Sequence, residues 1–289
     1  MRAAIDALHA AFAVDLPEAP LRSHVETAAG GLLLMPAWGE AGVGVKLVTL
    51  TDSNPGRGLP FVNALYVLFD AETQVPAATL DGAALTALRT AAVSGVATRL
   101  LARKDASRVA IFGAGVQARS HLEAMVAVRP VRDVMIVSRT RDRAEALADV
   151  AFGLGLQASI GSPDAVTGFD IVCTCTTSQT PLFDGALLRA GAHVNAIGAY
   201  LATMRELDTE AVRRSKVVVD TREAAFAEAG DLVIPLGEGA IGREHVLADL
   251  AELVRGAEVR TSTDDVTVFK AVGVAFEDLI VARAAVDRL

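Results

Sequence analysis

The chain has 289 residues, of which 52% are hydrophobic and 21% are charged. These fractions match globular averages, which excludes a disordered chain, a collagen-like repeat and a small disulfide-stapled protein. Lys and Arg total 27 against 35 Asp and Glu, so the formal net charge of −8 disfavours general binding to nucleic acid or anionic lipid. The length predicts two modest domains or one large α/β domain.

The apolar stretches indicate no membrane span, since the run at 62–69 is far shorter than the roughly 20 residues that cross a bilayer. Residues 1–12 have helical spacing and no small-residue cleavage site, so we expect no secretion signal and a cytoplasmic protein. The two cysteines, Cys173 and Cys175, are predicted to share one strand face as reduced core residues. Without a second ligand cluster, we expect no metal site.

The first hundred residues indicate an antiparallel sheet followed by a helix. Short β-branched and aromatic runs at 43–50, 63–69 and 77–80 are divided by turn residues. The run at 86–102 has apolar residues at helical spacing.

From residue 107 onward, strands alternate with helices, which predicts a parallel sheet. The predicted strands are 108–112, 134–138, 157–160, 171–174, 194–197 and 217–219. These six strands fit a dinucleotide-binding domain at 105–265. The segment 266–289 has helical spacing, and we expect it to return to the first domain, formed by 1–104 and 266–289.

A GxGxxA motif follows the first of these strands: Gly113, Ala114, Gly115, Val116, Gln117 and Ala118. Gly113 permits a tight turn, Gly115 lets a pyrophosphate approach the backbone, and Ala118 allows close helix packing. The start of the following helix attracts phosphate. This context favours dinucleotide binding over a chance glycine turn.

The end of the second strand reads Ser138, Arg139 and Thr140, with no carboxylate before Asp142. An acidic residue there would bind the ribose 2′-hydroxyl of NAD, whereas hydroxyls and the guanidinium of Arg139, with Arg143, suit a 2′-phosphate. NADP is therefore favoured over NAD. The alternative is that Arg139 is simply a solvated strand-end residue.

Three cations of the first domain, Arg22, Lys46 and Arg89, suggest a carboxylate-binding site. Lys46 and Arg89 lie inside apolar segments, where unpaired charge is costly, so each is expected to meet an anion or an acidic partner. Surface charges or structural ion pairs remain the alternative.

With these residues in view, the sequence resembles the ornithine cyclodeaminase and mu-crystallin family. The matching segments span nearly the whole chain: Val45-Lys46, Asn54-Pro55, Gly58-Leu59-Pro60, Leu85-Thr86, Arg89 to Ala92, Gly113 to Ala118, Asn195 to Ala199, Arg205 to Asp208, Gly273 to Ala275 and Asp278. The resemblance implies an α/β fold, in which a Rossmann domain joins a discontinuous α+β substrate-binding and dimerisation domain. Family members bind a small amino or imino acid at the interface, and relatives usually begin with an additional strand.

By position, the resemblance implies that Arg22, Lys46 and Arg89 hold the substrate carboxylate, with Lys46 and Arg89 as the catalytic pair. Thr90 would touch the cofactor phosphates. Further cofactor contacts are implied for six residues: Thr174, Cys175, Thr176, Ile197, Gly198 and Gly273.

Tyr200 is the main departure from the family pattern, since cyclodeaminases and the related alanine dehydrogenases have an aspartate there. A phenol with a reference pKa near 10 is a poor general base at neutral pH, and family members that reduce cyclic ketimines lack this aspartate. The resemblance thus implies an enzyme, an NADPH-dependent reductase of cyclic α-imino acids, with Tyr200 lining the substrate site and a homodimer as the assembly. An ornithine cyclodeaminase, an alanine dehydrogenase and a non-catalytic NADPH and small-ligand binding protein of mu-crystallin type remain open. No nucleic acid or membrane partner is expected.

Overall fold

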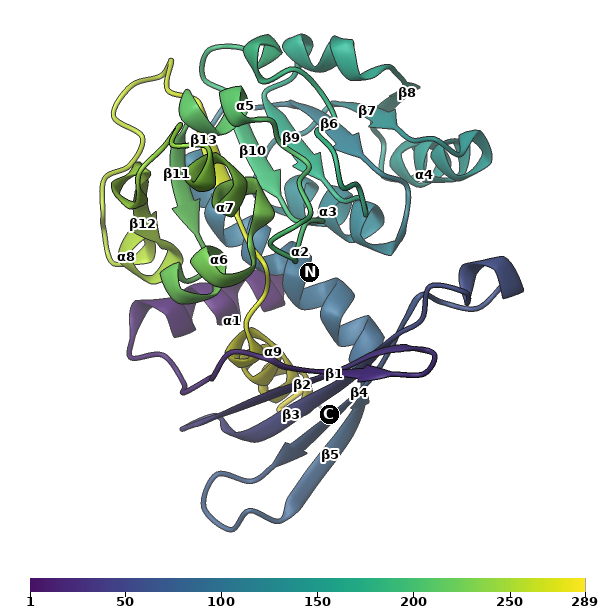
Figure 1. Cartoon of the computed structure of the whole chain (residues 1–289), viewed down its shortest axis with the longest axis vertical. Coiled ribbons are helices and arrows are strands. Elements are labelled where there is room, and N and C mark those ends of the chain that lie inside the picture. The colour runs from purple at the N-terminus through teal and green to yellow at the C-terminus, as the bar shows by residue number, and fades with distance from the viewer. Residues whose placement is uncertain (289) are drawn as a thin grey trace. The chain divides into compact units, whose positions relative to one another are not determined.

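The computed structural model describes residues 1–288 and divides the chain into two compact units (Figure 1). Unit 1 comprises Met1–Arg2 and Thr90–Gly273, and unit 2 comprises Ala3–Arg89 with the described residues from Val274 onward. The expected division into an NADP-binding domain at 105–265 and a substrate-binding and dimerisation domain at 1–104 and 266–289 concerns binding, and it stays a prediction.

Unit 2 is built on a five-stranded antiparallel sheet in which the strands follow chain order. Its strands are β1 (Ser23–Thr27), β2 (Gly30–Gly39), β3 (Gly42–Leu50), β4 (Val62–Phe69) and β5 (Pro76–Asp81). Gly42 opens β3 with φ +124, and a side chain there would lie 2.6 Å from the Phe69 carbonyl oxygen. Glycine is therefore required where the chain turns from β2 into β3 beside β4.

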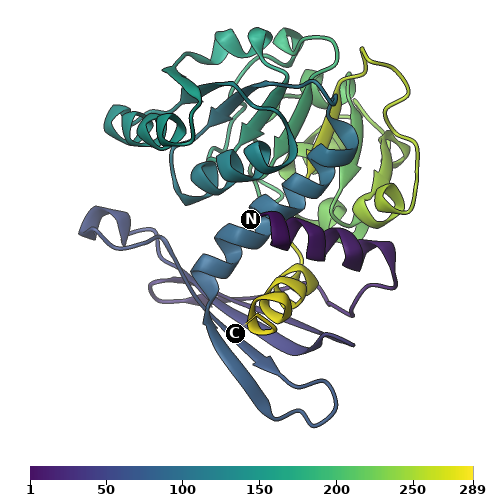
Figure 2. The ribbon, with the colours of Figure 1, turned by 180° about the vertical axis from the view of Figure 1, so that it is seen from behind.

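One face of this sheet is covered by α9 (Ala275–Val286), which packs against β2, β3 and β4 (Figure 2). The alternation of β3 buries Gly44, Lys46 and Val48 on a single face, as expected for a strand with one face in the core. Phe12 of α1 (Arg2–Ala13) meets Phe276 of α9 edge to face, with ring centroids 5.4 Å apart. The 3₁₀ turn η1 (Pro55–Arg57) lies between β3 and β4, and α2 (Gly82–Leu101) contains the boundary between the units.

The second face of the same sheet is apolar and is not fully buried. Strand register places three cross-strand rows on it: Leu34, Leu47 and Leu65; Pro36, Val45 and Val67; Trp38, Val43 and Phe69. The exposed fractions of Trp38 and Leu65 reach 45% and 47%. We call these nine residues the open sheet face.

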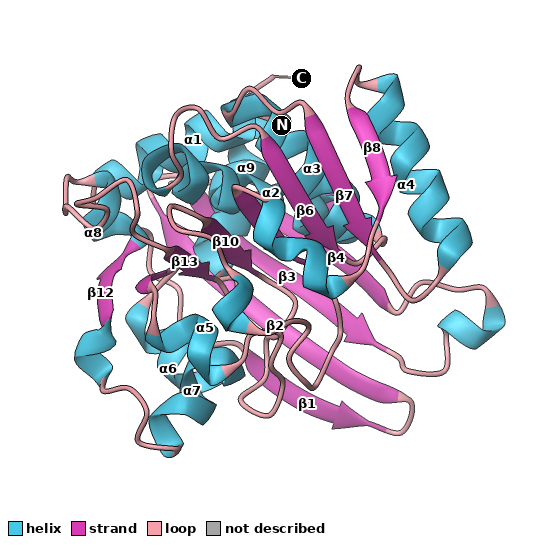
Figure 3. Ribbon diagram, turned by 90° about the horizontal axis from the view of Figure 1, so that it is seen from above, coloured by secondary structure: helices cyan, strands magenta, loops and turns pink. Residues whose placement is uncertain are grey.

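Unit 1 contains an eight-stranded parallel sheet in the order β12-β11-β13-β10-β9-β6-β7-β8, and Figure 3 shows β6, β7 and β8 side by side. The strands are β6 (Arg108–Phe112), β7 (Asp133–Val137), β8 (Gln157–Ile160), β9 (Ile171–Thr174), β10 (His193–Ala196), β11 (Lys216–Val219), β12 (Val246–Asp249) and β13 (Thr267–Lys270). Six neighbouring strands, in the order β8-β7-β6-β9-β10-β13, follow the strand order 3-2-1-4-5-6 of a Rossmann fold. The predicted fold class is confirmed.

The helices of unit 1 connect and flank these strands. They are α3 (Val116–Val128), α4 (Arg141–Gly153), α5 (Thr209–Arg213), α6 (Arg222–Glu228), α7 (Gly230–Gly237) and α8 (Leu250–Val254), with short 3₁₀ turns η2 (Pro163–Gly168), η3 (Gly185–Leu187) and η4 (Arg243–His245). Among them, α3 packs on β6 and β9, while α4 packs on β7 and β8.

The strand prediction for the parallel sheet was wrong in two places. The sheet has eight strands rather than six, because β12 and β13 were not predicted. The sixth Rossmann position belongs to β13, not to the predicted strand at 217–219, and β13 lies inside the segment that was expected to be helical from residue 266. β13 is fully buried between β10 and β11, where its β-branched and aromatic residues suit a central strand.

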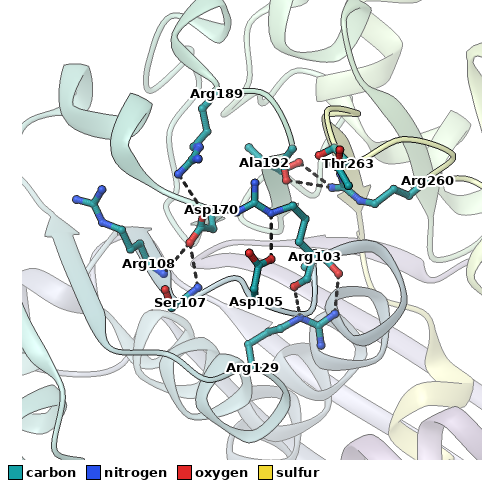
Figure 4. A network of polar contacts seen from close by, with 12 residues as sticks. Arg103, Asp105, Ser107, Arg108, Arg129, Asp170, Arg189, Ala192, Arg260 and Thr263 are labelled. Atoms are coloured by element: carbon teal, nitrogen blue, oxygen red, sulfur yellow. Dashed lines mark hydrogen bonds and ion pairs between the residues drawn. The ribbon is translucent and has the colours of Figure 1, made fainter.

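At the amino edge of the parallel sheet, arginine side chains satisfy a buried aspartate and several backbone carbonyls (Figure 4). Asp170, which precedes β9, accepts hydrogen bonds from the backbone N–H groups of Ser107 and Arg108 at 2.9 and 3.1 Å. Arg103 and Arg189 pair with the same carboxylate at 3.2 and 3.0 Å. This edge is therefore held together by satisfied polar contacts.

The described helices include none that is both long and apolar enough to cross a membrane.

Candidate active site

The glycine turn after β6 has the backbone that a dinucleotide requires. Gly113 has φ +107, and a side chain at this position would lie 2.5 Å from the Cys175 carbonyl oxygen. No other residue fits there without moving the backbone. The sequence predicted this tight turn from the motif alone.

The start of α3 is open toward a ligand. Gly115 caps the helix without a side-chain hydrogen bond, and no atom lies within 4 Å of a Cβ built on it. Val116 is exposed, and the side chain of Ala118 is completely buried under the sheet. Open amide N–H groups at the start of a 13-residue helix suit a pyrophosphate, so the residues present fit a dinucleotide.

At the end of β7, the Ser138 hydroxyl accepts a hydrogen bond from the Thr140 backbone N–H at 3.2 Å. Arg139 and Arg143 are exposed, and neither forms an ion pair with another residue in the described part of the chain. By contrast, Arg141 is bound to Glu145 at 2.7 Å. The arginines expected to meet a 2′-phosphate are therefore available to one.

The carboxyl ends of β9 and β10 meet at the buried carboxylate of Glu206. Glu206 accepts hydrogen bonds from Thr174, Thr176 and Gly198 at 2.6–2.7 Å. Cys175 and Ile197 lie beside these residues in the same two turns. The structure thus gathers the residues expected around the nicotinamide ribose, since neighbouring parallel strands end at one edge.

Three more predicted residues belong to unit 1. Gly273 has φ +81, and its backbone N–H donates to Asp220 at 2.7 Å, so a buried carboxylate fixes this turn. Tyr200 is half-buried, two residues beyond Gly198, and Thr90 is 8% exposed within α2.

Unit 2 contains a buried cluster of two cations and two carboxylates. Lys46 of β3 lies 2.7 Å from one carboxylate oxygen of Asp278, and Arg89 Nε lies 3.1 Å from the other. Arg89 also pairs with Glu277 at 2.8 Å. The expected acidic partners therefore exist, and both are contributed by the first turn of α9.

Burial and neighbouring cations lower the pKa of Lys46 to about 8, against the opposing attraction of Asp278. Arg89 is the stronger of these cations and Arg22, half-buried just before β1, is the weaker, so both other predicted cations act on Lys46 within unit 2. Tyr66 faces Lys46 across the β3–β4 pair, and its pKa is raised by burial and by the charge of Asp278. Its hydroxyl has no hydrogen-bond partner among the described residues.

Sequence reasoning missed three acidic residues of these sites. Glu277 and Asp278 stand side by side in the otherwise apolar run 271–282, which was a readable signal of buried ion pairing. Glu206 lies in the matched segment Arg205 to Asp208, but its partners come from turns that are distant in sequence. The roles assigned to individual site residues stay predictions.

A sequence model described as the ornithine cyclodeaminase/mu-crystallin family matches residues 2–289. The chain belongs to this family. The resemblance read from the sequence is therefore confirmed.

Named relatives of the ornithine cyclodeaminase/mu-crystallin family match over most of their length. A Delta(1)-pyrroline-2-carboxylate reductase of Bacillus cereus (strain ZK / E33L) is 38% identical over 258 residues, which cover 87% of this chain and 79% of the relative. A solved structure of Thermococcus litoralis Delta(1)-pyrroline-2-carboxylate reductase, in complex with NADH and L-proline, is 37% identical with a TM-score of 0.94, covering 99% of this chain and 92% of that one. An archaeal alanine dehydrogenase dimer with bound NAD is 32% identical, with a TM-score of 0.94 and coverage of 99% and 90%.

Proposed function

We propose that this chain is an NADPH-dependent reductase of cyclic α-imino acids, converting Δ1-pyrroline-2-carboxylate and Δ1-piperideine-2-carboxylate to proline and pipecolate. Both reductases reported above carry the name Delta(1)-pyrroline-2-carboxylate reductase, and one of them was solved with NADH and L-proline. The observation that carries the proposal is the pair of buried cations in unit 2, Lys46 and Arg89, together with the glycine turn at Gly113 in unit 1, which has the backbone that a dinucleotide requires.

The cations of unit 2 are suited to a carboxylate ligand. Lys46 and Arg89 are buried beside Asp278 and Glu277, and Arg22 adds a third positive charge that acts on Lys46. A buried positive charge favours an anion strongly, because little water competes for it. A substrate carboxylate held in this way has a fixed orientation, and orientation lowers the entropic part of the barrier.

Lys46 is the proposed proton donor to the imine nitrogen. Its pKa of about 8 keeps Nζ largely protonated at neutral pH, yet close enough to the working pH for proton transfer. Asp278 holds the ammonium at 2.7 Å and so fixes where this proton lies. A bound reduced nicotinamide supplies the hydride.

NADPH is proposed as the preferred cofactor. Support comes from Arg139 and Arg143, which are exposed and without ion-pair partners in the described chain, at the strand end where NAD-binding proteins have an acid. A bidentate guanidinium contact to a phosphate dianion is a strong charge-assisted interaction.

A steady-state assay with Δ1-pyrroline-2-carboxylate, Δ1-piperideine-2-carboxylate and either NADPH or NADH tests this function. We expect consumption of NADPH with both ring sizes and a lower efficiency with NADH. The parallel arm incubates the chain with ornithine and NAD, from which we expect no ammonia above background, because the family resemblance places Tyr200 where cyclodeaminases have an acid. Ammonia release as fast as imine reduction would refute the reductase, and cofactor binding without turnover of either imine would favour a binding protein.

We also propose a homodimer formed through the open sheet face. A row of apolar side chains such as Leu34, Leu47 and Leu65 is unfavourable in water, and burying it against a second copy gains about 25 cal/mol per Å². The archaeal alanine dehydrogenase of the same fold is described as a dimer. A cytoplasmic location stays a prediction of the sequence.

A further inference from the structure

Glu206 lies in the segment between β10 and α5, and its side chain is fully buried. None of the steps proposed above uses this carboxylate. Its surroundings nevertheless include most of the residues expected around the nicotinamide half of the cofactor.

Both oxygens of Glu206 accept two hydrogen bonds each. Oε1 accepts from the backbone N–H and the hydroxyl of Thr176, both at 2.7 Å. Oε2 accepts from the Thr174 hydroxyl at 2.7 Å and from the Gly198 backbone N–H at 2.6 Å. One carboxylate thus joins the turn after β9 to the turn after β10.

The chemistry of these donors requires an acceptor at each oxygen. A backbone N–H can only donate, and one such group faces each oxygen of Glu206, from Thr176 and from Gly198. The backbone approaches so closely here that a Cβ added at Gly198 would lie 2.0 Å from the Thr176 carbonyl oxygen and 2.6 Å from Glu206 Oε1. The two turns are in direct contact, and the carboxylate determines their spacing.

Glu206 is itself held from behind by a second buried pair. Its backbone N–H and that of Leu207 donate to Asp231 at 2.7 and 2.9 Å. Asp231 pairs at 3.0 Å with Lys270, whose Nζ also donates to the Ala199 carbonyl at 2.5 Å. Lys270 is the last residue of β13, so the backbone on either side of the carboxylate is anchored to a central strand.

We propose that Glu206 is a positioning residue that holds the turns after β9 and β10 in the shape that receives the nicotinamide half of the dinucleotide. The proposal rests on the dinucleotide-dependent function argued above. It predicts a specific division: Glu206 matters for the nicotinamide half, and it does not matter for the adenosine half, which the end of β7 with Arg139 is proposed to receive.

Glu206→Gln tests this division. The amide has the shape of the carboxylate, but its NH₂ must face either the Thr176 or the Gly198 backbone N–H, so one buried donor loses its acceptor. Dissociation constants are measured by fluorescence or calorimetry for NADPH and for adenosine 2′,5′-bisphosphate, which lacks the nicotinamide and its ribose. NADH and ADP form a second matched pair, in case the chain prefers NAD. We expect the variant to weaken binding of the whole dinucleotide by about tenfold or more and that of the adenosine fragment by less than about twofold.

Asp170→Asn is the matched control. Asp170 is also a buried carboxylate of unit 1 that accepts two backbone N–H groups, but at the amino edge of the same sheet (Figure 4). Its loss is expected to affect stability and to leave the ratio of dinucleotide to fragment affinity unchanged within about twofold. A purely structural role of Glu206 would give the same result as this control.

Should Glu206→Gln fail to fold, Glu206→Asp gives the answer, because it keeps the charge but shortens the reach between the two turns. Preferential loss of dinucleotide affinity in either variant supports the proposal. An equal change for dinucleotide and fragment, or no change for either, overturns it. If the unaltered chain binds neither NADPH nor NADH, the proposed function fails first, and the two failures are thereby distinguished.

Discussion

The charge of Asp278 is expected to control both the stability of unit 2 and the protonation of Lys46. Asp278→Asn keeps the side-chain shape and removes the partner of two buried cations, Lys46 at 2.7 Å and Arg89 Nε at 3.1 Å. Breaking a buried pair by removing one partner typically costs about 3–5 kcal/mol. Arg89 keeps its contact with Glu277, and Lys46 can release its proton, so we expect the lower end, about 3 kcal/mol at pH 7.

The pH dependence of this loss identifies its cause. In the unaltered chain, the folded-state pKa of Lys46 is about 8, below its ordinary value of 10.5. Burying the charged ammonium therefore lowers the free energy of unfolding by its full amount below pH 8, and this loss disappears as the pH rises toward 10.5. Without Asp278, which raises this pKa, Lys46 loses its proton at a lower pH. The stability difference between variant and parent is therefore largest below the variant's pKa, shrinks as the pH rises to about 8, and is constant beyond it.

Urea unfolding at pH 7 and pH 9 measures this difference, and the rate of imine reduction across the same range reports the same proton. We expect the destabilisation to be smaller at pH 9 and the alkaline fall in kcat to move below pH 8. Asp287→Asn at the end of the same helix is the control, because the side chains of Arg283 and Asp287 are 39% and 51% exposed and their pair is worth about 0.5 kcal/mol or less. Equal destabilisation at the two pH values, with an unmoved rate profile, would refute the role given to the Lys46 and Asp278 pair.

The remaining predictions concern cofactor choice, packing, chemistry and assembly. Arg139→Asp should lower the NADPH to NADH efficiency ratio by about one to two decades, since a charge-assisted contact is worth roughly 1.5–3 kcal/mol, and an unchanged ratio would remove the assignment. Tyr66→Phe should leave the free energy of unfolding unchanged or raise it by up to about 1 kcal/mol, because the buried hydroxyl has no partner among the described residues; a loss beyond about 1 kcal/mol would contradict this. Tyr200→Phe should slow imine reduction less than about tenfold, or 1.4 kcal/mol, whereas a loss of three decades would make the phenol the proton donor. Leu65→Asp should shift the chain to a monomer in analytical ultracentrifugation, while Leu247→Asp on β12, exposed to nearly the same extent at 48% against 47%, should not; a dimer that survives Leu65→Asp would exclude the open sheet face.

Much of the fold could be predicted because local pattern and tertiary environment agree. The strands at 43–50, 63–69 and 108–112 alternate or are continuously apolar, and the structure contains each of them. β2 was not predicted. Its four consecutive apolar residues do not alternate with polar ones, and Pro36, which follows them in the strand, argues against a strand. β13 was not predicted, because Phe269 also fits the helical spacing of the apolar residues that follow it.

The candidate site was only half predictable, for a similar physical reason. Cations inside apolar segments, such as Lys46 and Arg89, indicate that a partner must exist, but they do not identify it. The partners Glu277 and Asp278 are close only after α9 packs on the antiparallel sheet. Glu206 shows the same limit, since the backbone N–H donors that define its role carry no signal in the sequence.

The late position of β13 in the chain also constrains how unit 1 is made. β13 lies between β10 and β11, and until residues 267–270 leave the ribosome those two strands have unsatisfied edges facing each other. Pairing across so long a sequence separation is slow, and exposed strand edges promote aggregation. We therefore expect a nascent chain truncated before residue 267 to bind chaperones and resist purification, although it already contains the whole glycine turn.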